Sequence, residues 1–286
     1  MDLLIVDTLE ADVVEWLGRR HSVRLAPELA YEPREFRRAL YDVRAAIVPA
    51  SATIDAETLD FAPVLRAIGR VSAGAESIDV AMCERRGIEV VRSLTASARA
   101  EAEFMIGAML SLLRRVPVPG DSGAVAGREL GGATIGLVGM PPAARSIAQL
   151  LAGFGATIIG YDPALHASDN VWPLWQVAPA GLRELVERSD VVCVQLAYFS
   201  RYQGLLGDRF LRHSKPNQVL VSTAHSGLFD EAALAAALRS GRIAAAWLDS
   251  AEPGLLDPER PLHGIETLQM TPRIAATTHE SRQRSA

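Results

Sequence analysis

The segment Thr134–Arg145 carries the residues best suited to binding a phosphate group. An apolar run ends at Gly139 and a helical pattern follows. In a turn of the form G-x-G-x-x-G, backbone N–H groups and a helix N-terminus bind the pyrophosphate of a dinucleotide. Here Pro141 occupies the second glycine position and Ala144 the third, where alanine is an accepted variant. Because Pro141 and Pro142 have no N–H, and each lost charge-assisted hydrogen bond costs about tenfold in affinity, we expect weak cofactor binding.

An acidic residue ends the next predicted strand, where the ribose of a dinucleotide would lie. Asp162 and Pro163 follow the apolar run Thr157–Tyr161. A carboxylate at this place accepts hydrogen bonds from ribose hydroxyls and repels a 2′-phosphate, which favours NAD over NADP. A solvated turn carboxylate is the alternative interpretation. Arg145, at the start of the helix after the glycine turn, lies either near a phosphate or simply on the surface.

Short apolar runs alternate with helical periodicity along the first half of the chain, which is typical of a parallel sheet covered by helices. We expect strands at Leu3–Val6, Ser22–Leu25, Ala45–Val48, Ala67–Val71 and Ile88–Val91. We expect helices at Ala11–Arg20, Glu32–Tyr41, Ala56–Leu59, Ile78–Arg86 and, longest of all, Ala98–Arg115. The Pro/Gly-rich residues 116–127 that follow are typical of a linker.

The second half follows the pattern of a nucleotide-binding domain. We expect strands at Thr134–Val138, Thr157–Tyr161, Val191–Gln195, Val219–Ser222, Ala244–Leu248 and Thr267–Met270. We expect helices at Ala143–Phe154, Leu182–Arg188, Asp208–Arg212 and Glu231–Ser240. The predicted fold class is therefore α/β, with two Rossmann-like or flavodoxin-like domains, parallel sheets and a cleft between the domains.

Composition limits the classes of protein that the chain can represent. Its 286 residues suffice for about two domains, and 49% hydrophobic with 22% charged residues is ordinary for a globular protein. A net charge of −5 argues against a nucleic-acid or polybasic membrane surface, and no apolar run is long enough for a membrane span. The first residues lack a signal-peptide pattern and the two cysteines fit reduced, buried thiols, so we expect a cytoplasmic protein. The histidines lack the spacing of a metal site, and no metal is expected.

Several segments occur in an order and spacing that resemble the D-isomer-specific 2-hydroxyacid dehydrogenases. These segments are Arg70–Asp79, Ala102–Arg114, the glycine turn, Tyr161–Pro163, Val219–Glu231, Gly241–Asp249 and Thr271–Ala275. The resemblance implies NAD-dependent hydride transfer on a small 2-hydroxy or 2-keto acid. It also implies a substrate-side domain of residues 1–92 and 273–286, a nucleotide domain of residues 93–272, and a homodimer with the long helix 98–115 near its interface.

The family's catalysis, as the resemblance implies it, uses an Arg that orients the substrate, a His that exchanges the proton and a Glu that holds that His. In this chain His225 lies in the segment where the Arg belongs, and Arg273 lies where the His belongs. The position of the Glu depends on the loop after Asp249. A direct alignment places Gly254 there, and a shift of two residues places Glu252 there.

Two interpretations of this pattern stay open. In one, the catalytic residues have been lost or reassigned, and the chain is a non-redox descendant: a binding or regulatory protein, or an enzyme of different chemistry. In the other, Arg and His have exchanged places, so that His225 is the general acid/base, Arg273 binds the substrate carboxylate and Glu252 orients the imidazole. An imidazole exchanges protons near neutral pH, and a guanidinium binds a carboxylate through two hydrogen bonds.

The resemblance further implies the ligand-binding residues and the form of the C-terminus. The expected cofactor contacts are Gly139, Met140, Pro141, Ala144, Arg145, Asp162, Ala197 and Thr223. The expected substrate contacts are Ser72, Ala73 and Gly74. The polar tail after Ala275 ends before the closing helix that family members usually return to the first domain, so we expect an apolar patch there that is exposed or covered by a partner.

Overall fold

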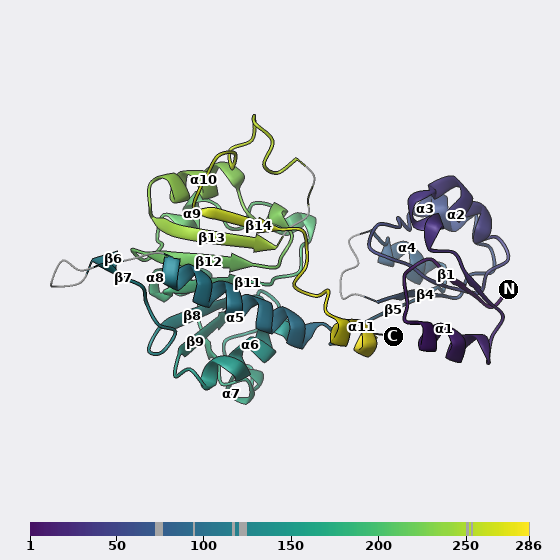
Figure 1. The fold of residues 1–286 in the computed structure, drawn as a ribbon, viewed down its shortest axis with the longest axis horizontal. Coiled ribbons are helices and arrows are strands. Elements are labelled where there is room, and N and C mark those ends of the chain that lie inside the picture. Colours follow the sequence, from purple (N-terminus) through teal and green to yellow (C-terminus); the bar gives the residue numbers. More distant parts are fainter. Residues whose placement is uncertain are drawn as a thin grey trace. The chain divides into compact units, whose positions relative to one another are not determined.

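The computed structural model describes residues 1–71, 77–93, 95–115, 118–119, 125–249, 252 and 254–285. These residues form two compact units: unit 1 comprises Met1–Ser97 and Thr277–Ala286, and unit 2 comprises Ala98–Ala276. Each unit is built on a sheet of parallel strands flanked by helices (Figure 1). The predicted α/β fold class is therefore confirmed. The expected substrate contacts Ser72, Ala73 and Gly74 lie outside the described residues.

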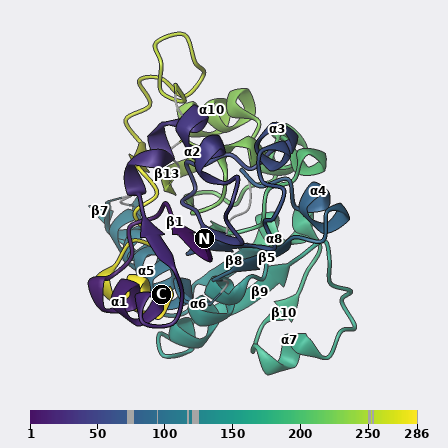
Figure 2. The ribbon, with the colours of Figure 1, turned by 90° about the vertical axis from the view of Figure 1, so that its right-hand side faces the viewer.

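The sheet of unit 1 has five strands that lie where the apolar runs predict them. The strands are β1 (Leu3–Ile5), β2 (Val23–Leu25), β3 (Ala45–Ile47), β4 (Ala67–Arg70) and β5 (Glu89–Arg92), in the spatial order β2-β1-β3-β4-β5. The helices between them are α1 (Ala11–Gly18), the 3-10 helix η1 (Pro27–Tyr31), α2 (Pro33–Ala39), α3 (Ala56–Asp60) and α4 (Val80–Arg85). Figures 1 and 2 show α1 on one side of this sheet and α2 and α3 on the other, so both faces are covered.

The C-terminal tail forms a short helix in unit 1, so the expectation that the chain ends before a closing helix was wrong. Helix α11 (His279–Ser285) belongs to unit 1, where the Arg284 side chain donates from Nε to the backbone oxygen of Ala96 at 2.9 Å. Its first turn is capped by Thr278, whose hydroxyl accepts the N–H of Ser281 at 3.0 Å. This helix is stabilised by the Thr278 cap and the Arg284 hydrogen bond rather than by an apolar stripe, which is why hydrophobic periodicity does not reveal it.

Unit 2 begins with the long helix α5 (Ala98–Arg115) and a small antiparallel pair, β6 (Val118–Pro119) and β7 (Val125–Ala126). Its main sheet has the order β10-β9-β8-β11-β12-β13-β14. The strands are β8 (Thr134–Val138), β9 (Thr157–Tyr161), β10 (Ala178–Pro179), β11 (Val191–Val194), β12 (Gln218–Ser222), β13 (Ile243–Asp249) and β14 (Leu268–Thr271). The helices are α6 (Pro142–Ala152), α7 (Val171–Leu174), α8 (Leu182–Arg188), α9 (Asp208–Leu211) and α10 (Glu231–Arg239), with 3-10 turns η2 (Ser200–Tyr202) and η3 (Ser226–Leu228).

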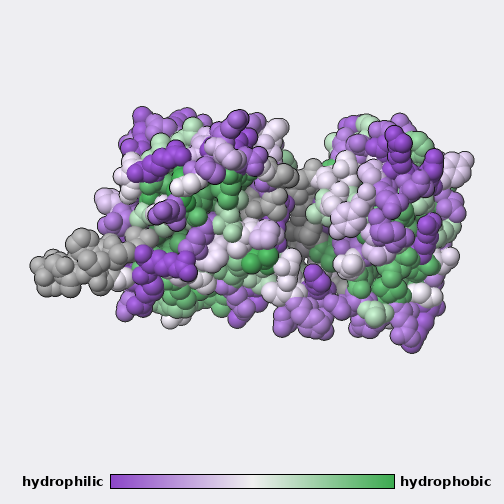
Figure 3. Space-filling view, turned by 45° about the horizontal axis from the view of Figure 1, so that its top comes forward, coloured by the Kyte–Doolittle hydropathy of each residue, from purple (hydrophilic) through white to green (hydrophobic). Residues whose placement is uncertain are grey.

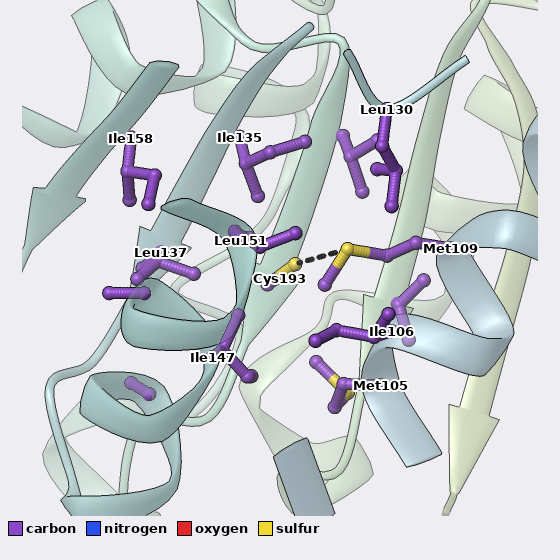
Figure 4. Packing of buried hydrophobic residues seen from close by; sticks show 14 of the residues in the cluster. Met105, Ile106, Met109, Leu130, Ile135, Leu137, Ile147, Leu151, Ile158 and Cys193 are labelled. Carbon is purple, nitrogen blue, oxygen red and sulfur yellow. Dashed lines mark hydrogen bonds between the residues drawn. The ribbon is translucent and has the colours of Figure 1, made fainter. Parts of the chain in front are cut away.

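Both faces of the central strands β8, β11 and β12 are buried: successive side chains of each strand point to opposite sides, and helices cover both sides. On one face, Cys193 of β11 lies among residues of α5 and α6, and its thiol is 3.9 Å from the sulfur of Met109 (Figure 4). On the other face, Val192 and Val194 pack against α8 and α10. Central strands such as β8 and β11 therefore read as continuous apolar runs, as expected of a covered parallel sheet.

The strand order indicates where this sheet can bind a ligand: along the edge formed by the carboxyl ends of its strands. From β8 the chain winds outward through β9 to β10, and then returns to the other side of β8 with β11. The carboxyl ends of β8 and β11 therefore lie at the point where the winding direction reverses, which is where open α/β sheets bind ligands. The loops after β8, β11 and β12 all leave from this edge.

The surface seen in Figure 3 is mostly hydrophilic, with separate hydrophobic areas on both units. Exposed apolar side chains of unit 1 include Trp16, Leu25 and Tyr31, and those of unit 2 include Leu174 and Phe199. Within the described part of the chain, no helix is long and apolar enough to cross a membrane. The same residues contain no group of three or more His, Cys, Asp or Glu side chains arranged to hold a metal ion.

Candidate active site

Gly139 makes the turn from β8 to α6 possible. Its φ is +90°, in the left-handed region that favours glycine, and its N–H donates to Tyr161 O at 2.7 Å. A Cβ at this position would lie 2.5 Å from both N and Cα of Leu196, in the segment after β11. The glycine is therefore required for two strand ends to approach each other, whether or not a ligand is bound.

The prolines of the turn lie at the first positions of helix α6. Pro141 is the N-cap residue and Pro142 the first helical residue, and the first intrahelical bond joins Arg145 N–H to Pro141 O at 3.3 Å. Proline is well tolerated here because the N–H of the first helical residue has no intrahelical acceptor. No side chain caps α6. Its first-turn N–H groups, at Ala143 and Ala144, are thus the ones that helix geometry offers to an anion.

Asp162, directly after β9, stabilises the glycine turn through hydrogen bonds to backbone N–H groups. One carboxylate oxygen accepts the N–H of Met140 at 2.8 Å, and the other accepts the N–H of Ala164 at 2.9 Å. A carboxylate offers about four lone-pair sites, so each oxygen of Asp162 can accept a further hydrogen bond from a ribose hydroxyl. The structure therefore gives this half-buried residue a role in the turn that the sequence pattern does not reveal.

Arg145 is also attached to the turn. Its Nε donates to Met140 O at 3.3 Å, and its guanidinium stacks 4.6 Å from the ring centre of Trp175. Trp175 in turn meets the buried ring of Trp172 edge to face, with their centroids 6.0 Å apart. The arginine is therefore a half-buried side chain whose position is fixed by the turn and by Trp175.

The two remaining expected cofactor residues follow the neighbouring strands. Ala197 lies in the loop after β11 and is exposed, and Thr223 directly follows β12, where its N–H donates to Val194 O at 3.2 Å. Since β8, β11 and β12 are adjacent and parallel, Gly139, Ala197 and Thr223 all lie at the carboxyl edge of one sheet. The expected cofactor residues are thus gathered along this edge.

The three expected catalytic side chains meet in unit 2, beside the same edge. His225 Nε2 lies 3.4 Å from Glu252 Oε1, and Arg273 forms a salt bridge with that same oxygen through Nη2. The other oxygen of Glu252 accepts the N–H of Ser226 at 3.4 Å. His225 follows β12, Glu252 follows β13 and Arg273 follows β14, so consecutive strands deliver the three residues to one place. Of the two alignments, the one that uses Glu252 places a carboxylate between the histidine and the arginine.

Glu252 is the electrostatic centre of this cluster. Burial raises the pKa of its carboxyl, but the hydrogen bond from Arg273 and the charges of His225 and Arg273 outweigh this effect, so the pKa lies below its ordinary value of 4.5. The side chain is 18% exposed, against 28% for His225 and 44% for Arg273. At neutral pH a mostly buried negative charge therefore lies between an imidazole and a guanidinium.

Arg273 stands on a strained turn that Asp249 stabilises. Its φ is +54°, an uncommon conformation for a residue other than glycine. The buried carboxylate of Asp249, at the end of β13, accepts the N–H groups of Ile274 and Ala275 at 2.9 and 2.8 Å. It also accepts the Thr271 hydroxyl at 2.6 Å. Strain held by several hydrogen bonds is typical of functional positions, and here it places the guanidinium against Glu252.

Tyr198 is a residue of the cluster that the sequence does not predict. Its ring stacks on the His225 imidazole, with centroids 4.4 Å apart and an interplanar angle of 17°. Tyr198 comes from the loop after β11 and His225 from the loop after β12. Because the stack joins two loops, no spacing within one segment signals it.

These features define a two-unit α/β protein whose larger unit has a dinucleotide-type turn and a His–Glu–Arg cluster on one sheet edge. Residues 108–275 match the family model of the D-isomer specific 2-hydroxyacid dehydrogenase, NAD binding domain. The chain therefore belongs to the D-isomer-specific 2-hydroxyacid dehydrogenase family, as the sequence resemblance predicts.

Individual relatives agree with this assignment. The chain is 33% identical over 291 residues to the (S)-sulfolactate dehydrogenase of Chromohalobacter salexigens, which covers 99% of this chain and 94% of that protein. It is 30% identical over 293 residues to the D-3-phosphoglycerate dehydrogenase of Mycobacterium bovis, where the match covers 99% of this chain but 54% of that protein. The chain thus spans about half the length of the second relative.

A solved structure shows the same fold. The acyclic imino acid reductase in complex with NADPH and D-Arg superposes with a TM-score of 0.85, over 100% of this chain and 93% of that one. The two sequences are 20% identical, so this likeness concerns the fold alone.

Proposed function

We propose that this protein is an NAD-dependent dehydrogenase that interconverts a small 2-hydroxy acid and the corresponding 2-keto acid. The observation that carries the proposal is the contact of His225, Glu252 and Arg273 in one unit, beside the edge that holds the glycine turn. A proton carrier, its partner carboxylate and a carboxylate-binding group are the three functions that this reaction requires of the protein.

The residues of the turn fit a dinucleotide. Gly139 has no side chain to obstruct the pyrophosphate, α6 begins without a side-chain cap, and each oxygen of Asp162 has lone pairs left for ribose hydroxyls. NAD, once bound, would accept or donate the hydride. In our proposal Met140, Pro141, Ala144, Arg145, Ala197 and Thr223 line its site. Because Pro141 lacks an N–H, we propose that binding is weaker than in a turn with glycine at this position.

In the cluster, His225 exchanges the proton of the substrate hydroxyl. Glu252, ionised at neutral pH, stabilises the imidazolium that forms when the ring takes up this proton. Arg273 uses part of its guanidinium on Glu252 and has further N–H donors for the substrate carboxylate, since arginine has five. Ser72, Ala73 and Gly74 stay the proposed substrate contacts of unit 1.

Two measurements on the purified protein test this function. Calorimetric titration with NAD and NADH comes first, because a dehydrogenase must bind a dinucleotide and a non-redox descendant need not. The second is NADH formation with a panel of 2-hydroxy acids that includes sulfolactate and 3-phosphoglycerate, the substrates in the names of the two relatives. Binding with turnover supports the proposal. No binding at millimolar dinucleotide and no turnover with the panel would support the non-redox alternative.

We also propose that the protein is a homodimer with α5 near the interface, as in the family that it resembles, and that it acts in the cytoplasm. Both cysteines, Cys83 and Cys193, are buried free thiols, which suits a reducing compartment. Light scattering at micromolar concentration tests the assembly, and a monomer mass alone would contradict the dimer.

A further inference from the structure

The imidazole of His225 is enclosed by groups that fix the plane of its ring. One face is covered by the half-buried ring of Tyr198, at a centroid distance of 4.4 Å and nearly parallel. The loop that carries Tyr198 is itself attached to the His225 turn, because Gly204 N–H donates to Gly227 O at 2.9 Å and Leu206 N–H donates to Leu228 O at 2.9 Å. The stack thus joins two segments that backbone hydrogen bonds already hold together.

Gly227 completes the enclosure. Its N–H donates to Nδ1 of His225 at 3.0 Å. A Cβ on this residue would lie 2.9 Å from Tyr198 Cε2 and 3.1 Å from His225 Nδ1. Gly227 does not have a positive φ, so the backbone conformation itself does not demand glycine. The absence of a side chain therefore serves to let the two rings stack.

These contacts decide which tautomer the neutral ring adopts. Since Nδ1 accepts a hydrogen bond, the neutral ring carries its proton on Nε2, which points toward Glu252 Oε1 at 3.4 Å. The charged groups at this nitrogen are Glu252 and, on the same carboxylate oxygen, Arg273. A half-turn of the ring would break the Gly227 hydrogen bond, and any smaller rotation would also tilt the ring out of the stack.

We propose that Tyr198 is a positioning residue for His225: its ring and Gly227 hold the imidazole in one orientation and one neutral tautomer, with Nε2–H directed at Glu252. This inference rests on the proposed function, in which His225 is the general acid/base. It adds a residue from a different loop and names the tautomer that the ring holds. The contribution comes from the face of the aromatic ring, so the Tyr198 hydroxyl is not needed.

The position of the ring can be observed without any activity. Long-range ¹H–¹⁵N correlation spectra distinguish the two tautomers of a neutral histidine, and the signal of His225 is the one absent from His225→Ala. We expect wild type and Tyr198→Phe to show one tautomer, with the proton on Nε2. We expect Tyr198→Leu, which removes the aromatic face but keeps a large apolar side chain, to show a mixture of both tautomers.

Gly227→Ala tests the same enclosure from the other side, because the added methyl group forces the rings apart. Gly181→Ala is its matched control, since a Cβ there meets no atom within 4 Å and its φ is also negative. We expect Gly227→Ala to resemble Tyr198→Leu in the spectra, and Gly181→Ala to resemble wild type.

Kinetics supply the second measurement. Aromatic stacking is worth roughly a three- to tenfold effect, so Tyr198→Leu should lower kcat by about that factor with little change in KM, and Tyr198→Phe should restore it. An unchanged tautomer and an unchanged kcat in Tyr198→Leu would overturn the proposal. If wild type shows no dehydrogenase activity with any acid tested, the proposed function fails, while the spectra still decide whether Tyr198 and Gly227 position the ring.

Discussion

At the glycine turn the contacts are made by backbone groups, whereas at the His225 cluster they are made by side chains. Gly139, Met140 and Ala164 take part in the turn through N–H groups, and Asp162 is the side chain that joins the last two. In the cluster, the Glu252 carboxylate contacts both His225 and Arg273. Removal of Glu252 breaks both contacts, and removal of His225 or Arg273 breaks one of them. The turn can therefore accept a changed side chain such as Pro141 and keep its shape, while the cluster depends on each residue type. Substitutions in the two regions should accordingly have different signatures.

The largest expected effect is that of Gly139→Ala, which should lower the free energy of unfolding of unit 2 by about 3 kcal/mol. The alanine would have to adopt a φ of +90°, and its Cβ would overlap the backbone of Leu196. Urea unfolding monitored by circular dichroism measures the change, with Gly181→Ala as the control glycine. A stability equal to wild type would show that the strand ends can separate at little cost.

Glu252→Gln should act on catalysis. The substitution keeps the shape of the side chain but removes the charge that stabilises protonated His225, and we expect kcat to fall by about 100-fold. Steady-state kinetics with the best acid of the panel measure this effect, and the NAD dissociation constant is the control, since it should not change. A kcat within about twofold of wild type would remove Glu252 from the mechanism.

Pro141→Gly should increase the affinity of the turn for NAD. The glycine restores one N–H near the pyrophosphate, which corresponds to about tenfold tighter NAD binding. Calorimetric titration measures the two dissociation constants side by side. Equal affinities would indicate that the proline, at the N-cap of α6, removes no donor that the cofactor uses.

The smallest expected effect concerns acid stability. The pKa of Glu252 is lowered in the folded protein, so its ionised form stabilises the fold above pH of about 4.5, and this contribution is lost as pH falls through the folded-state pKa. Wild type should thus exceed Glu252→Gln in unfolding free energy at pH 7, and the difference should shrink as the pH falls below 4.5. Urea titrations at pH 7 and at successively lower pH measure it, and a difference that grows with acidity would contradict the assigned sign.

Most of the fold could be predicted because its signals are local. The apolar runs that become β8, β9 and β11 are buried on both faces, and glycines or prolines bound the helices between them. The failures are elements without a helical pattern of apolar and polar residues. Helix α7 is only four residues long and contains Pro173, and α11 is polar and is held by its cap and by Arg284. Contacts of this kind depend on tertiary structure, which periodicity does not record.

For the site, the sequence predicted the residues but not the interactions that hold them. His225, Glu252 and Arg273 could be named from a family pattern, although the alignment of Glu252 depended on an unknown loop. Their meeting on one carboxylate, the Asp249 turn under Arg273 and the Tyr198 stack all join residues from different strand ends. Such pairs are decided by sheet order, which the sequence alone does not supply.

The most direct test of the account is a comparison of His225→Ala with Arg273→Ala in steady-state kinetics, using the best 2-keto acid and NADH. We predict that His225→Ala loses kcat by 100-fold or more while the acid still binds, because proton exchange is removed. We predict that Arg273→Ala chiefly raises KM, because a ground-state contact with the carboxylate is lost. Rates for both variants equal to that of wild type would contradict the central claim that this cluster performs the reaction.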